Sequence, residues 1–297
     1  MSSVRVETHV YARRGGQELL LDIHRPDNVS GPLPVVLFIH GGGWFMGNRT
    51  TGPDFSRFFA RDGFAMVSIE YRLSSTAIFP ACLEDVQSAV RWVRENVGDR
   101  IGIWGCSAGG HLGALVALAL PAGEICCVLD AYGPSRFDLM DQQAEQEQAT
   151  LQAPIPEFSG PPAMGTHSAA DSPESRLLGA PVPEVPELVR AASPLTCVRA
   201  DAPPFLLMHG NADRSVPRGQ SVILYEALAA AGNDVTLRLV DGLPHSFFNR
   251  SDIDDAGPFR MEVREYSEGG TEVRREERAG VFDVAREFLQ RNLIRDV

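Results

Sequence analysis

Lysine is absent from this 297-residue chain, so all 27 of its lysine-or-arginine positions are arginine, and 39 acidic residues outnumber them. The formal net charge is therefore -12 at pH 7. An acidic surface repels phosphate backbones and anionic lipid. We therefore expect neither nucleic acid nor a membrane surface as a partner.

Cysteine is scarce, and long apolar runs are missing. The cysteines show no C-x-x-C spacing and mostly lie in apolar runs, which is typical of reduced packing residues. The N-terminus lacks the apolar segment of a secretory signal, and the longest apolar run, residues 112–120, is too short to span a bilayer. We therefore expect a cytoplasmic protein. The five cysteines are Cys82, Cys106, Cys126, Cys127 and Cys197.

Motifs for metals and nucleotides are also missing. No group of His, Cys and Asp residues has the spacing of metal ligands. No G-x-G-x-x-G follows a strand pattern, and there is no Walker A motif. We therefore expect no metal and no cofactor.

The apolar pattern predicts an α/β fold. Residues 4–11 and 18–24 alternate apolar and polar side chains around a Gly-Gly turn, which predicts an N-terminal antiparallel hairpin. Strand and helix patterns then alternate, which predicts a mainly parallel, doubly wound sheet with helices on both faces. The expected strands are 34–39, 65–70, 100–104, 125–131, 204–209 and 234–240, and the expected helices are 54–62, 84–96, 111–120, 219–231 and 281–293.

Two segments interrupt this alternation, although no linker divides the chain, so we expect a single domain over residues 1–297. Residues 135–193 are rich in Pro, Gly, Ser and polar side chains, which predicts a lid inserted after the sixth strand. Residues 251–280 predict an extra hairpin that turns at Glu268-Gly269-Gly270.

The predicted extra hairpin places Phe259, Met261 and Val263 on one face, and this face needs a partner. The partner could be the parent domain near His245 or a second subunit, so a homodimer is one expectation. A disordered charged excursion is the third interpretation, because residues 272–278 are rich in Arg and Glu.

The chemistry is indicated by Gly105-Cys-Ser-Ala-Gly109, a G-x-S-x-G sequence between a strand pattern and a helix pattern. In a nucleophile elbow of this kind, a strained turn exposes the serine hydroxyl at the start of a helix. A Gly-rich strand-to-helix turn without catalysis has the same pattern. If the elbow is catalytic, Ser107 is the nucleophile.

A serine nucleophile needs a base, usually a histidine that a carboxylate orients. Asp213 follows the strand pattern that ends near Met208, and His245 follows the one that ends near Val240. Each alone could be an ordinary loop residue. Together, in the order Ser, Asp, His and each after a strand, they predict a catalytic triad of Ser107, Asp213 and His245.

An oxyanion hole needs backbone N–H groups where negative charge develops. The loop His40-Gly-Gly-Gly43 directly follows a buried-type strand, so we assign this role to Gly42 and Gly43, together with the amide of Ala108. Trp44 and Phe247 adjoin the catalytic loops, where they would either form walls of the acyl pocket or serve only in packing.

These motifs, with Glu70-Tyr-Arg-Leu73 and Ala131-Tyr-Gly-Pro134, resemble those of the α/β-hydrolase superfamily. The chain is most similar to hormone-sensitive-lipase-like carboxylesterases, in particular the feruloyl-esterase and acetylesterase branch, over about residues 17–250. Cys106 stands where many such esterases have Asp or Glu.

The resemblance implies a serine hydrolase that cleaves small-molecule esters of small acyl groups through an acyl-enzyme. An arylformamidase or amide hydrolase, or a biosynthetic acyltransferase or cyclase, would use the same triad. A non-catalytic receptor on this fold is the third alternative, although such receptors typically lose the histidine that this chain keeps.

Overall fold

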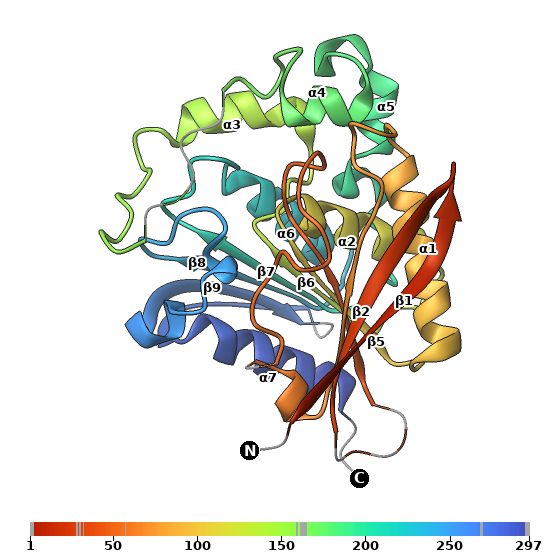
Figure 1. The fold of residues 1–297 in the computed structure, drawn as a ribbon. Coiled ribbons are helices and arrows are strands. Elements are labelled where there is room, and N and C mark those ends of the chain that lie inside the picture. The colour runs from red at the N-terminus through yellow and green to blue at the C-terminus, as the bar shows by residue number, and fades with distance from the viewer. Residues whose placement is uncertain are drawn as a thin grey trace.

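A computed structural model describes residues 3–27, 29, 31, 33–56, 58–158, 160, 165–267 and 270–294. Its strands are β1 Val4–Arg14, β2 Gln17–Pro26, β3 Val35–Ile39, β4 Ala65–Ile69, β5 Ile101–Cys106, β6 Cys127–Ala131, β7 Phe205–Gly210, β8 Val235–Val240, β9 Phe259–Ser267 and β10 Thr271–Ala279. They form one sheet in the order β1-β2-β4-β3-β5-β6-β7-β8-β9-β10 (Figure 1). Neighbours from β4 to β8 are parallel, and the pairs at either end are antiparallel.

Both faces of the sheet are apolar and covered by helices. Along β3, Val35, Leu37 and Ile39 belong to one core cluster, and Val36 and Phe38 to the other, because side chains alternate along a strand. The first cluster includes apolar side chains of α1, α2 and α6, and the second includes those of α7. These helices are α1 Ala81–Asn96, α2 Ala108–Ala119, α6 Gly219–Ala230 and α7 Val281–Leu293.

This arrangement confirms the predicted mainly parallel sheet with helices on both faces and the N-terminal antiparallel hairpin. The helix expected over residues 54–62 is wrong, since among the described residues of this range the one helical element is the 3-10 turn η1, Ala60–Asp62. Phe55, Phe58 and Phe59 are buried, and Phe59 has a positive φ of 66°. Burying these aromatic rings therefore overrides the helical pattern.

Between β6 and β7 the chain forms short helices that Figure 1 shows in green above the sheet. Residues 159 and 161–164 of the segment named as the lid lie outside the described residues. No helix in the described ranges is both long and apolar enough to cross a membrane. The elements of this segment are η2 Phe137–Leu139, α3 Met140–Glu147, α4 Pro173–Leu178, η3 Val182–Glu184, α5 Pro186–Ala191 and η4 Pro194–Cys197.

The segment after β8 contains η5 Phe247–Asn249 and η6 Ile253–Ala256, followed by β9 and β10. β9 pairs along β8, so the hairpin extends the main sheet. Glu268 and Gly269 of its expected turn lie outside the described residues. Phe259, Met261 and Val263 are buried in the core cluster on the α7 side. The chain itself covers this apolar face, so the interpretation in which a second subunit covers it is wrong. A homodimer as such stays a prediction.

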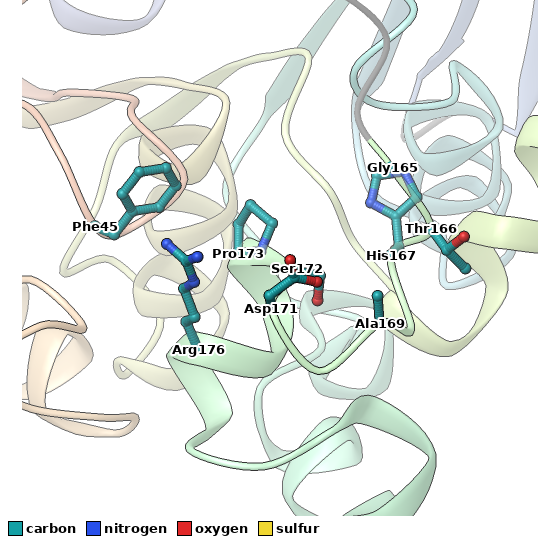
Figure 2. Close-up of a pocket in the computed structure, with 9 residues that line it drawn as sticks. All are labelled: Phe45, Gly165, Thr166, His167, Ala169, Asp171, Ser172, Pro173 and Arg176. Carbon is teal, nitrogen blue, oxygen red and sulfur yellow. The ribbon is translucent and has the colours of Figure 1, made fainter.

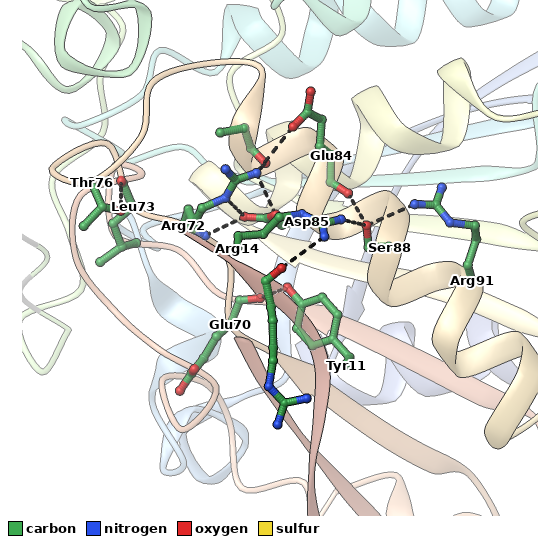
Figure 3. Close-up of polar contacts among 12 residues, drawn as sticks. Tyr11, Arg14, Glu70, Arg72, Leu73, Thr76, Glu84, Asp85, Ser88 and Arg91 are labelled. Carbon is green, nitrogen blue, oxygen red and sulfur yellow. Dashed lines mark hydrogen bonds and ion pairs between the residues drawn. The ribbon is translucent and has the colours of Figure 1, made fainter. Parts of the chain in front are cut away.

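The connection from β4 to α1 is fixed by a bidentate ion pair (Figure 3). Arg72 donates from Nε to Asp85 Oδ2 at 2.8 Å and from Nη2 to Asp85 Oδ1 at 2.9 Å. Asp85 is fully buried, and it also accepts the backbone N–H of Arg72. This pairing anchors the neighbouring Tyr71, which contacts the His40 loop.

Candidate active site

Ser107 lies at the turn from β5 into α2 with φ 55° and ψ −121°, a strained backbone conformation for a residue with a side chain. The two glycines of the motif allow this turn. A methyl group on Gly105 would lie 2.1 Å from the carbonyl oxygen of Gly109, and one on Gly109 would lie 1.9 Å from that of Ile39. Strand and helix therefore approach more closely than any other residue type permits.

The three residues expected to form the triad lie in one chain of hydrogen bonds. His245 Nε2 is 2.9 Å from Ser107 Oγ, and His245 Nδ1 is 2.6 Å from Asp213 Oδ2. Asp213 Oδ1 accepts the backbone N–H groups of Ser215 and Val216 at 2.8 and 3.0 Å. The carboxylate is thus fixed on one side by its own loop and on the other by the imidazole.

The loops that carry Asp213 and His245 are packed directly against each other. A methyl group on Gly210 would lie 2.0 Å from the carbonyl oxygen of Leu243, which also accepts the N–H of Ala212 at 3.0 Å. The loops follow β7 and β8, which are neighbouring parallel strands. Parallel pairing brings their carboxyl ends to the same edge of the sheet, which is why residues 32 positions apart meet.

A second histidine contacts the acid. His209 Nε2 is 3.2 Å from Asp213 Oδ2 and 3.0 Å from the Val216 carbonyl oxygen, while its Nδ1 is 2.8 Å from Ser221 Oγ. Burial alone would raise the pKa of Asp213, but the charge of His245 and the hydrogen bonds from both histidines hold it well below its usual range. No pattern in the sequence predicted this contact of His209.

The expected oxyanion loop adopts backbone conformations that favour glycine, with φ 117° at Gly42 and 56° at Gly43. Gly41 lies against the nucleophile, since a methyl group there would be 3.2 Å from the Ser107 Cβ. Within the part of the chain that the structure describes, the N–H groups of Gly42, Gly43 and Ala108 donate to no other backbone group. Other backbone groups therefore do not occupy these three donors, and their role as an oxyanion hole stays a prediction.

Tyr71 holds the end of this loop that directly follows β3. Its hydroxyl donates to the His40 carbonyl oxygen at 3.0 Å, and its ring stacks on the His40 imidazole with centroids 4.4 Å apart. His40 Nδ1 is 2.7 Å from the Gly41 carbonyl oxygen. Burial lowers the pKa of His40 to about 4, so this imidazole is neutral at pH 7.

Trp44 anchors the other end of the loop. Its indole Nε1 donates to His111 Nδ1 at 3.2 Å, and His111 Nε2 donates to the Ala192 carbonyl oxygen at 2.6 Å. Burial lowers the pKa of His111 to about 4, which keeps Nδ1 available as the acceptor. The loop is thereby tied to α2 and to the segment between β6 and β7.

A cavity of about 260 Å³ opens at Ser107 and His245. Gly42, Gly43 and Trp44 line it, in agreement with their expected places. Phe247 does not belong to its wall: this ring is fully buried and packs against Tyr132 and Phe248, so its expected place in the acyl pocket is wrong. The turn after His245 directs the Phe247 side chain into the core. The other lining residues, whose place in a pocket no sequence pattern predicted, are Phe45, Met46, Pro134, Pro173, Glu174, Ser215, Val216 and Ser246.

The family model described as BD-FAE matches residues 21–228, more than half of the chain. The chain belongs to the BD-FAE family. The match includes the strand–turn–helix around Ser107 and extends to α6. It ends before His245, so the structure rather than the family model brings this residue into the site.

Relatives of this BD-FAE chain carry esterase names. Esterase LipC of Mycobacterium tuberculosis (strain ATCC 25618 / H37Rv) is 32% identical over a match that covers 77% of this chain and 57% of LipC. Esterase LipQ of the same organism is 33% identical, with 73% of this chain and 51% of LipQ covered. The chain thus spans about half the length of these curated relatives.

A solved structure of a truncated carbohydrate esterase from gut microbiota superposes with a TM-score of 0.67 at 28% identity, covering 82% of this chain and 90% of that one. Together with the esterase relatives, this match confirms the predicted α/β-hydrolase fold and the resemblance to esterases.

Proposed function

We propose that the chain is a serine hydrolase that cleaves carboxylic esters of small acyl groups through an acyl-enzyme. One observation carries the proposal: the unbroken chain of hydrogen bonds from Ser107 Oγ through His245 to Asp213. This is the geometry in which an imidazole can take the proton of a serine hydroxyl. The esterase names of LipC and LipQ support ester hydrolysis as the reaction.

In the proposed first half-reaction, Ser107 Oγ attacks the ester carbonyl carbon while His245 Nε2 takes the serine proton. The carbonyl oxygen becomes negatively charged and accepts hydrogen bonds from the amides of Gly42, Gly43 and Ala108. The bond to the alcohol oxygen then breaks, and His245 returns the proton to that oxygen. Alcohol leaves, and the acyl group stays on Ser107.

Water completes the cycle by the same steps. His245 takes a proton from a water molecule, whose oxygen attacks the acyl carbon. The bond to Ser107 Oγ breaks, the serine regains its proton and the carboxylic acid leaves. Asp213 stays ionised throughout, because its low pKa reflects stabilisation of the carboxylate, and it stabilises His245 whenever the imidazole is charged.

The size of the cavity supports small substrates. Its volume of about 260 Å³ is below the range of roughly 300–1,000 Å³ typical of drug-sized ligand pockets. The Trp44 ring closes one part of its wall and is itself buried. We therefore propose a preference for short acyl chains without interfacial activation, as expected for a small-molecule ester substrate.

The alternatives use the same residues. Amide or formamide hydrolysis differs mainly in the need to protonate a leaving nitrogen, and acyl transfer or cyclisation differs in the group that replaces water. A non-catalytic receptor is disfavoured because His245 lies within hydrogen-bonding distance of Ser107.

A panel of p-nitrophenyl esters from acetyl to decanoyl, with one formanilide, tests the reaction. We expect the highest kcat/KM with the shortest acyl groups and a loss of roughly 10⁴-fold in kcat for Ser107→Ala. A fluorophosphonate should label Ser107 alone, and the exposed Ser267→Ala should match the parent enzyme. Labelling of a different serine, or rates that rise with chain length and jump above the micellar concentration, would contradict the proposal.

A further inference from the structure

A carboxyl group lies in the catalytic cavity, and the proposed mechanism does not use it. Glu174 is the second residue of α4, and its side chain is only 4% exposed. It lines the same cavity as Ser107 and His245. Among the residues that line this cavity, it is the one carboxylic acid.

Only one oxygen of this carboxyl group has a partner. Oε1 is 3.1 Å from His167 Nδ1, whereas Oε2 is buried and has no hydrogen-bond partner among the described residues. A buried polar atom without a partner is destabilising, and more so when it is charged. Such an atom, on a residue that lines a cavity, indicates a place for a donor from a bound molecule.

His167 is itself fixed in place. Its backbone N–H donates to Asp141 Oδ1 at 2.6 Å, and the next N–H, that of Ser168, donates to Asp141 Oδ2 at 3.0 Å. Burial alone would lower the pKa of His167, but its hydrogen bond to Glu174 and the charge of that group outweigh burial and raise it. His167 therefore acts as a donor that holds Oε1 and leaves Oε2 without a partner.

The wall around this pair packs against the loop expected to bind the oxyanion. A methyl group on Gly43 would lie 3.2 Å from Pro173 Cβ, and the Arg176 guanidinium lies 5.5 Å from the centre of the Phe45 ring. Figure 2 shows Phe45 and Arg176 on one side of Pro173 and His167 on the other, around an adjoining cavity of about 310 Å³. The helix that carries Glu174 is thus docked on the loop expected to bind the oxyanion.

A second polar atom without a partner belongs to Ser215, another residue that lines the catalytic cavity. Ser215 Oγ is buried and has no hydrogen-bond partner among the described residues, although the Ser215 N–H is held by Asp213. A hydroxyl can donate and accept, whereas a carboxylate only accepts. The cavity therefore offers one strong acceptor and one amphoteric group, beside the groups assigned to the reaction.

We propose that Glu174 Oε2 and Ser215 Oγ form a recognition site for a hydroxyl group of the substrate, so that the enzyme selects esters that carry a free hydroxyl near the scissile bond. This inference rests on the proposed ester hydrolysis and adds a specificity determinant to it. The substrate hydroxyl donates to Glu174 and accepts from Ser215, which satisfies both buried atoms at once. An analogue without the hydroxyl leaves them unpaired.

Two matched pairs of substrates separate the two parts of the ester. For the acyl part, p-nitrophenyl 3-hydroxybutyrate is compared with p-nitrophenyl butyrate. For the alcohol part, 2,3-dihydroxypropyl acetate is compared with propyl acetate, with acid release followed in a pH-stat. In each pair, the selectivity is the kcat/KM of the hydroxylated ester divided by the kcat/KM of the plain ester. Partial unfolding of a variant lowers both values by the same factor, so it leaves the selectivity unchanged.

We expect a selectivity of roughly 10- to 100-fold in one of the two pairs, the size typical of a hydrogen bond to a charged group. Glu174→Gln should bring that ratio close to one, and Ser215→Ala should lower it by about 2- to 10-fold. Glu187→Gln, which changes an exposed carboxylate of the same segment, should leave the ratio unchanged. If Glu174→Gln does not fold, Ser215→Ala carries the test, because it removes one oxygen atom only.

A parent enzyme that hydrolyses the plain esters with a ratio near one in both pairs would overturn this inference alone. So would a high ratio that survives in both variants. Failure to hydrolyse any of the four esters would instead overturn the proposed function, and the recognition site with it.

Discussion

Replacing Asp213 with asparagine probes the electrostatics of the site while its shape is kept. Two imidazole nitrogens approach Oδ2, His245 Nδ1 at 2.6 Å and His209 Nε2 at 3.2 Å. Two backbone N–H groups of its own loop approach Oδ1. All four of these groups are donors, so an oxygen is needed at both positions.

Asparagine supplies only one oxygen. If that oxygen stays with the backbone donors, the amide NH₂ faces His245 Nδ1, which must then become an acceptor. The proton of a neutral His245 moves to Nε2, and the imidazole can no longer take the proton of Ser107. A triad with the wrong tautomer loses roughly 10⁴-fold in kcat, so we expect a loss of that order for Asp213→Asn.

The assay is hydrolysis of p-nitrophenyl acetate between pH 6 and 9, with far-UV circular dichroism as the check on folding. The matched control is Asp201→Asn, an exposed carboxylate that should retain the parent activity. A folded Asp213→Asn enzyme that loses less than about 100-fold would refute the assignment of Asp213 as the residue that orients His245, since the tautomer argument leaves no other route.

Three further predictions concern stability. Gly109→Ala should abolish folded protein, because its methyl group would lie 1.9 Å from a carbonyl oxygen. The control Gly165→Ala, whose methyl group would have nothing within 4 Å, should keep the melting temperature of the parent. Equal melting temperatures of the two variants would contradict this prediction. Met261→Ala should lower the free energy of unfolding, measured in urea, by about 2–5 kcal/mol, because Met261 is buried. The control Thr271→Ala, at an exposed position, should lower it by less than about 0.5 kcal/mol. Similar losses in the two variants would argue against a buried β9. Burial lowers the pKa of His111 to about 4 from its ordinary 6.5, so the unfolded chain takes up its proton first on acidification. The free energy of unfolding should fall by about 3 kcal/mol from this group between pH 6.5 and 4, and His111→Gln should lose that part of the slope.

The sequence by itself determined which segments form the strands of the sheet and indicated the chemistry. Ser107, Asp213 and His245 were recognisable because each follows an apolar strand pattern, and parallel strands deliver such residues to one edge. The glycines of the elbow and of the His40 loop were recognisable because close backbone approach excludes every other side chain there. These are local constraints that leave a local pattern.

Only the tertiary structure decided which side chains share a cavity. Glu174 and Ser215 are 41 positions apart and belong to no motif, so nothing in the sequence predicted that both would line the cavity at Ser107. In the same way, the apolar pattern of β9 predicted that Phe259, Met261 and Val263 need a partner without saying that β8 and the core provide it. Strand alternation specifies which face of a segment is apolar, whereas the packing of distant segments determines what covers that face.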